Sequence, residues 1–66
     1  MTELDTWRSA NILLKRYGGK AVFIATKRAD ALLDQGDVHG CSAWLRIAKA
    51  ITELERKAAD KSDRVH

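Results

Sequence analysis

The chain has 66 residues, a formal net charge of +3 and one cysteine, Cys41. This length allows a single domain, and a lone cysteine excludes an internal disulfide. A hydrophobic share of 45% excludes a disordered polar chain, and the apolar runs are shorter than the ~18–20 residues of a membrane-spanning helix. The first residues lack the basic and apolar regions of a secretory signal, so we expect a cytoplasmic protein with a reduced thiol.

The first predicted helix lies between a polar cap and a pair of glycines. Either Thr2 or Asp5 is expected to cap its start, because a side-chain oxygen accepts hydrogen bonds from the free amides of the first turn. Gly18 and Gly19 are expected to end it, since glycine takes the backbone conformation needed just past a helix end. Between them, apolar side chains recur three and four residues apart, which is typical of a helix: Trp7, Ala10, Leu14 and Tyr17.

A second helix is predicted over residues 20–34. Ala21, Ala25 and Ala29 are four residues apart, so they form a ridge of small side chains along one helix face. Such a ridge allows a neighbouring helix to pack closely. This face is therefore expected to lie in the core.

The second helix is predicted to turn into a third at a Gly-Asp corner. Gly36 is expected at the end of the second helix and Asp37 at the N-cap of the third, which we predict over residues 38–58. Glycine at position 40 favours a close approach of the second helix to this turn. The expected fold is an all-α, three-helix domain of residues 1–58 in which a helix precedes a helical hairpin, with residues 59–66 as a frayed tail. The apolar stripe of the third helix is Cys41, Trp44, Leu45, Ile47, Ala48, Ile51, Leu54 and Ala58.

The corner also carries Asp37, His39 and Cys41, three residue types that act in catalysis and metal binding. Residues two apart on a helix point about 200° away from each other, so His39 and Cys41 should not meet. Their spacing matches no common metal site. We therefore predict a buried, inert thiol, no catalytic residues, no metal and no cofactor.

The apolar side chains exceed what a monomer of this size needs to bury. The surplus consists of Ile12 or Leu13, Phe23 and Leu45, and it favours a protein–protein interaction module that self-associates as a dimer or binds another protein. Large side chains dominate interface energetics, so Trp7, Phe23 and Leu45 are the predicted partner-binding residues. Trp44 is expected in the core.

Basic residues concentrate in the front half of the chain. Residues 1–28 carry six Lys or Arg against two acidic residues, whereas residues 29–66 carry six against seven. An alternative function is therefore a small nucleic-acid-binding or regulatory protein. The stretch "VHGCSAW" at the start of the third helix argues against base recognition, because it lacks Arg, Lys, Asn and Gln. The candidate anion or nucleic-acid contacts are Lys15, Arg16, Lys20, Lys27 and Arg28.

The segment from Tyr17 to Leu54 resembles short uncharacterised helical proteins of alphaproteobacteria. The resemblance rests on the pattern "RAD…L…GD..G…W..I..AI..L", which begins at Arg28 and ends at Leu54. It implies a small bacterial helical protein and transfers no catalytic residue. The hairpin is also similar to one tetratricopeptide-type unit. A solenoid needs about three such repeats, so we interpret the likeness as independent use of the same turn residues between two helices.

Overall fold

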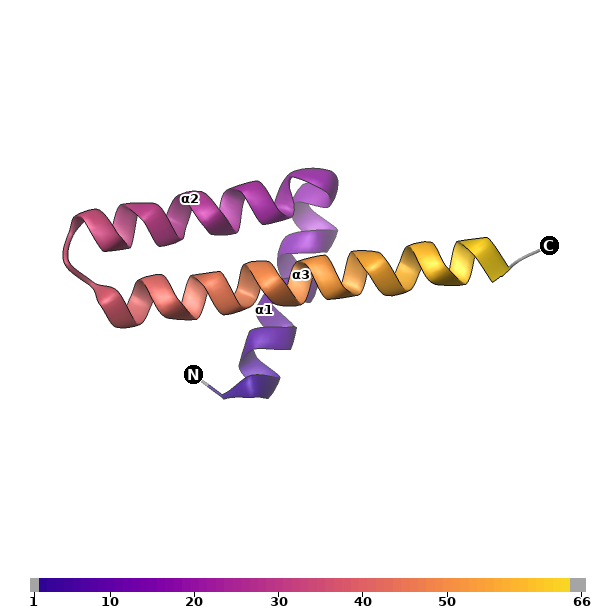
Figure 1. Cartoon of the computed structure of the whole chain (residues 1–66), viewed down its shortest axis with the longest axis horizontal. Coiled ribbons are helices and arrows are strands. Elements are labelled where there is room, and N and C mark those ends of the chain that lie inside the picture. The colour runs from indigo at the N-terminus through magenta and orange to yellow at the C-terminus, as the bar shows by residue number, and fades with distance from the viewer. Residues whose placement is uncertain (1, 65–66) are drawn as a thin grey trace.

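A computed structural model describes the backbone of residues 2–64 and the side chains of residues 2–59. Over this range the chain is all helical, as predicted. Helix α1 spans Glu3–Tyr17, a short 3₁₀ segment η1 spans Gly18–Lys20, α2 spans Ala21–Asp34 and α3 spans Val38–Arg64. Helices α2 and α3 lie side by side as an antiparallel hairpin, and α1 runs across this hairpin and packs on α3 (Figure 1).

Helix α3 is longer than predicted. It continues to Arg64, so the expected end near Ala58 is wrong. The second half of α3 runs past the start of α2 and beyond the crossing with α1 (Figure 1). The side chains of the predicted tail after Ala59 lie outside the described residues. None of the described helices is both long and apolar enough to cross a membrane.

The ends of α1 follow local capping chemistry. Thr2 is the N-cap, and its Oγ1 accepts a hydrogen bond from the amide of Asp5 at 3.2 Å. Of the two predicted caps, Thr2 is therefore the correct one. At the other end, Gly18 has a φ of +57° and donates its amide to the carbonyl of Leu14. Glycine adopts this backbone conformation without the steric penalty that a Cβ brings.

Backbone hydrogen bonds and a side-chain cap close the corner between α2 and α3. The amide of Gly36, with a φ of +81°, donates to Leu33 at 2.9 Å, and the amide of Asp37 donates to Leu32 at 2.8 Å. These two bonds form a Schellman motif. Oδ1 of Asp37 accepts the amide of Gly40 at 2.8 Å. The predicted roles of Gly36 as helix end and Asp37 as N-cap are therefore confirmed.

The nearest neighbour of Gly40 is the capping side chain of Asp37 and not the second helix, which the sequence predicted. The three atoms nearest to a Cβ at residue 40 all belong to the Asp37 carboxylate, with Cγ at 2.8 Å and Oδ1 at 3.1 Å. These atoms belong to the cap and not to α2. Glycine at this position makes room for the capping side chain, because the carboxylate occupies the volume that a Cβ would take.

The core consists mainly of small side chains. Ala21, Ala25 and Ala29 are fully buried, so the predicted alanine ridge is confirmed. The only large side chains buried almost completely in the described part are Ile47 and Ile51 of α3. The buried hydrophobic residues are Ala10, Leu13, Ala21, Ala25, Ala29, Cys41, Ile47, Ala48, Ala50 and Ile51. The half-buried Trp7 and Trp44 pack against this cluster.

Candidate functional site

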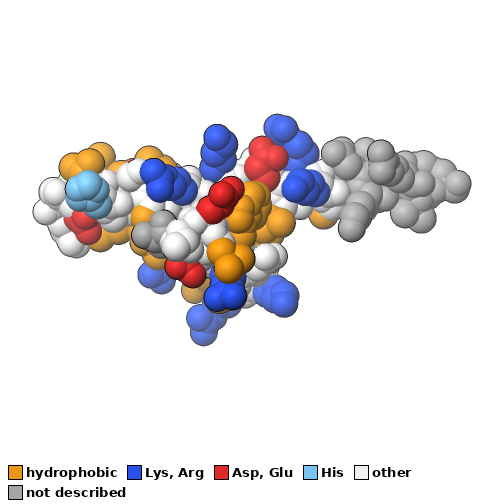
Figure 2. Space-filling view, turned by 90° about the horizontal axis from the view of Figure 1, so that it is seen from below, with side chains coloured by type: hydrophobic (Ala, Val, Ile, Leu, Met, Phe, Trp, Pro, Cys, Tyr) orange, Lys and Arg blue, Asp and Glu red, His pale blue; other side chains and the backbone are white. Residues whose placement is uncertain are grey.

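Large hydrophobic side chains remain exposed on all of the helices α1, α2 and α3. Phe23 is 61% exposed and Leu45 is 49% exposed, as their place in the apolar surplus predicts. Figure 2 shows hydrophobic side chains on one face, both near the corner end of the hairpin and in the middle of the molecule, with Lys and Arg around them. The full set in the described residues is Leu4, Ile12, Tyr17, Phe23, Leu33, Val38 and Leu45.

Of the three predicted partner-binding residues, Trp7 alone lines the groove between α1 and α3. Trp7 is half-buried and lies in a groove between α1 and α3, and neither Phe23 nor Leu45 lines that groove. Phe23 is close to the start of α2, under the Nζ of Lys27 at 5.5 Å from its ring centroid. Leu45 lies in the first half of α3, about two turns after the helix begins. The groove beside Trp7 therefore does not include the other two predicted partner-binding residues.

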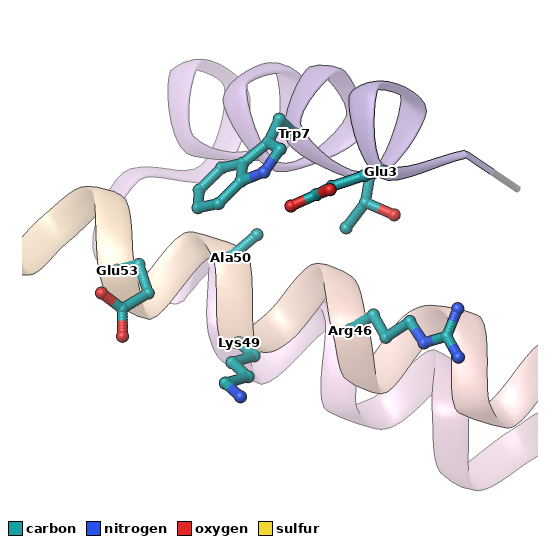
Figure 3. Close-up of a pocket in the computed structure, with 7 residues that line it drawn as sticks. Glu3, Trp7, Arg46, Lys49, Ala50 and Glu53 are labelled. Carbon is teal, nitrogen blue, oxygen red and sulfur yellow. The ribbon is translucent and has the colours of Figure 1, made fainter.

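The groove beside Trp7 has a volume of about 420 Å³. Figure 3 shows the indole of Trp7 and the carboxylate of Glu3 projecting from α1 toward α3, with Ala50 beneath them. Arg46, Lys49 and Glu53 line it from α3, but Lys49 and Glu53 point away from α1 (Figure 3). Acidic and basic side chains are balanced around this groove, so it favours no ligand charge.

A second groove lies where α1, α2 and α3 meet, and its charged side chains are both arginines. It has a volume of about 180 Å³ and is lined by Arg16 and Tyr17 of α1, Arg28 of α2 and Trp44 of α3, among others. The guanidinium carbon of Arg28 is 5.0 Å from the centroid of the Trp44 ring. This distance is in the range of a cation–π interaction, which orients the arginine. We call this surface the arginine groove.

The five predicted basic contacts are only partly brought together. Arg16 and Arg28 line the arginine groove, whereas Lys15, Lys20 and Lys27 line neither groove and are exposed. The sequence pointed to both arginines as candidates. It could not show that they converge, because they lie on different helices whose crossing depends on long-range packing.

The three residues near the corner that were candidates for chemistry have separate surroundings. Cys41 is a free, buried cysteine, as predicted, and His39 is exposed. Within the described part of the chain, no group of three or more His, Cys, Asp or Glu residues is placed to hold a metal ion. Asp37 is used by the helix cap.

Comparison of the chain with protein-family models, curated proteins and solved structures finds no match. The resemblance to alphaproteobacterial helical proteins therefore stays a prediction that rests on the residue pattern alone.

Proposed function

We propose that the chain is a non-enzymatic, three-helix interaction module that self-associates, burying exposed hydrophobic side chains of its hairpin against a second copy. The observation that carries the proposal is the distribution of side-chain size. Six of the ten buried hydrophobic residues in the described part are alanines, whereas seven large hydrophobic side chains are exposed. A monomer that could bury its large side chains would gain more from the hydrophobic effect than this arrangement provides.

Chain length supports the same proposal. Domains below about 70–80 residues rarely obtain more than about 3–5 kcal/mol from their core and often depend on oligomerisation. A core dominated by alanine contributes less than one of leucine and isoleucine, because each alanine removes less apolar area from water. Association with a second copy would supply the missing burial.

The corner end of the hairpin carries three exposed apolar side chains that could make this contact. Val38 and Leu45 are seven residues apart on α3, so they lie on nearly the same side of the helix. Leu33 is at the end of α2, next to the corner that leads to Val38. All three are about half exposed or more. We call Leu33, Val38 and Leu45 the corner patch.

A second copy is the partner that this patch fits best. Two-fold dimers place the same patch of both subunits in contact, and an uncharged apolar patch suits such self-pairing. A stable interface buries about 800 Å² per partner. The accessible surface of the chain is 5108 Å², so such an interface would take about one sixth of it.

Light scattering and sedimentation equilibrium over a range of protein concentrations test the proposal. We expect a concentration-dependent dimer whose dissociation constant rises about tenfold or more in a Leu45→Ser variant, because a central apolar contact is lost. Leu4→Ser is the matched control, since Leu4 is similarly exposed but lies on α1 away from the corner patch. A wild-type chain that stays monomeric at all concentrations overturns self-association, and equal effects of both variants overturn the assignment to the corner patch.

A further inference from the structure

The arginine groove provides a second, independent site. We propose that it binds a small phosphate monoester, held by Arg16 and Arg28 with its organic part against Tyr17 and the apolar wall. The proposal does not rest on self-association, because the groove and the corner patch share no residue.

The charge of the groove selects for a dianion. Two guanidinium groups line it from two helices, and none of its described lining residues is acidic. A phosphate monoester carries about −1.5 to −2 charges at neutral pH, which balances two guanidinium groups. A carboxylate carries only a single negative charge and leaves one arginine uncompensated. Arginine also presents a planar pair of donors that matches phosphate oxygens.

The groove holds Arg28 in place before a ligand arrives. Its guanidinium carbon lies 5.0 Å from the centroid of the Trp44 ring, and Trp44 in turn packs against the core cluster. Side-chain freedom that is already restricted need not be lost on binding, which favours affinity. Arg16 belongs to the last turn of α1, next to Tyr17. The two arginines therefore sit on separate, packed helices and not on one flexible segment.

The remaining lining fits a small organic phosphate. Ser9 and Tyr17 bring hydroxyl groups that can donate to phosphate oxygens, and the buried Leu13 supplies an apolar floor. The groove volume of about 180 Å³ leaves space for a small ligand. A phosphate group and part of a small ring would occupy this space.

Titration with phenyl phosphate, followed by amide shifts in NMR spectra and by tryptophan fluorescence, tests the site. We expect saturable binding, with the largest shifts around Arg16, Arg28 and Trp44. Arg16→Gln and Arg28→Gln should each weaken binding about tenfold or more, since each removes charged hydrogen bonds to the phosphate. Arg28→Lys should also weaken binding, because lysine keeps the charge but loses the planar donor pair.

Arg46→Gln is the matched control. It removes the same charge from the chain, but Arg46 lines the groove beside Trp7. Unchanged binding by Arg46→Gln supports the arginine groove, whereas an equal loss shows non-specific attraction to a basic surface and overturns the proposal. The proposal is also overturned if wild-type protein gives no saturable shifts, if benzoate or benzyl alcohol binds as tightly as phenyl phosphate, or if duplex DNA binds more tightly with the same arginine dependence.

Discussion

The Asp37 carboxylate accepts the amide of Gly40 at 2.8 Å and occupies the volume where a Cβ of residue 40 would lie. The cap and the glycine therefore depend on each other. Asp37 also donates its amide to Leu32 and accepts the amide of Cys41 at 3.0 Å through its carbonyl. Asp37 therefore takes part both in the C-terminal cap of α2 and in the N-terminal cap of α3.

This dependence predicts a non-additive pair of substitutions. Asp37→Ala should lower the free energy of unfolding by about 1 kcal/mol, the usual loss for an N-cap. Gly40→Ala in the wild type should change it little, because a gain in helix propensity of up to about 1 kcal/mol is offset by displacement of the cap. In the Asp37→Ala background the cap is gone, so Gly40→Ala should stabilise the protein. Urea unfolding of the four proteins measures the cycle, and additive effects would contradict the steric link.

The two glycines that follow α1 should differ sharply. Gly18 has a φ of +57°, whereas no positive φ is found at Gly19, and neither has a neighbouring atom within 4 Å of a Cβ. Gly18→Ala should therefore destabilise the protein by about 1–3 kcal/mol through backbone strain alone. Gly19→Ala is the control and should be neutral or stabilising by up to about 1 kcal/mol. Thermal unfolding monitored by circular dichroism compares the two, and equal midpoints would show that the backbone at Gly18 is not strained by a side chain.

The alanine ridge should not tolerate larger side chains. Ala25 is fully buried, so Ala25→Leu should force α2 away from its neighbours and lower the free energy of unfolding by about 1–3 kcal/mol. Ala31 is exposed on the same helix, and Ala31→Leu should change stability by no more than about 0.5 kcal/mol. Chemical denaturation of both variants provides the measurement. Similar losses would mean that close packing does not set the size of residue 25.

In the monomer, the loss of stability on substitution should follow the burial of a side chain and not its size. Ile51 is fully buried, so removing one methyl group in Ile51→Val should lower the free energy of unfolding by about 0.5–1.5 kcal/mol. Phe23 is larger but 61% exposed, and Phe23→Ala should have a smaller effect on the isolated chain. Denaturation at the lowest workable protein concentration isolates this comparison from any association. A larger loss at Phe23 than at Ile51 would show that Phe23 is buried in solution.

Capping and turn chemistry made the helix boundaries predictable. Thr2, Gly18, Gly36 and Asp37 act through hydrogen bonds and backbone angles within a few residues of themselves. Such features can be assigned from the order of residues, and the alanine ridge follows in the same way from helical spacing. The predicted end of α3 is too early, because the regular spacing of apolar residues stops before the helix ends at Arg64.

Contacts between segments distant in the sequence decide where the grooves form and which side chains stay exposed, so neither could be predicted from the sequence. Ala50 is not part of the predicted stripe, yet it is buried because α1 crosses α3 at this position, bringing Trp7 to the same groove. Arg16 and Arg28 meet in one groove for the same reason. Local propensity and periodicity give the helices and their apolar faces, but the angle at which α1 packs on the hairpin results from side chains fitting together across helices. That angle decides which apolar and charged side chains share a surface.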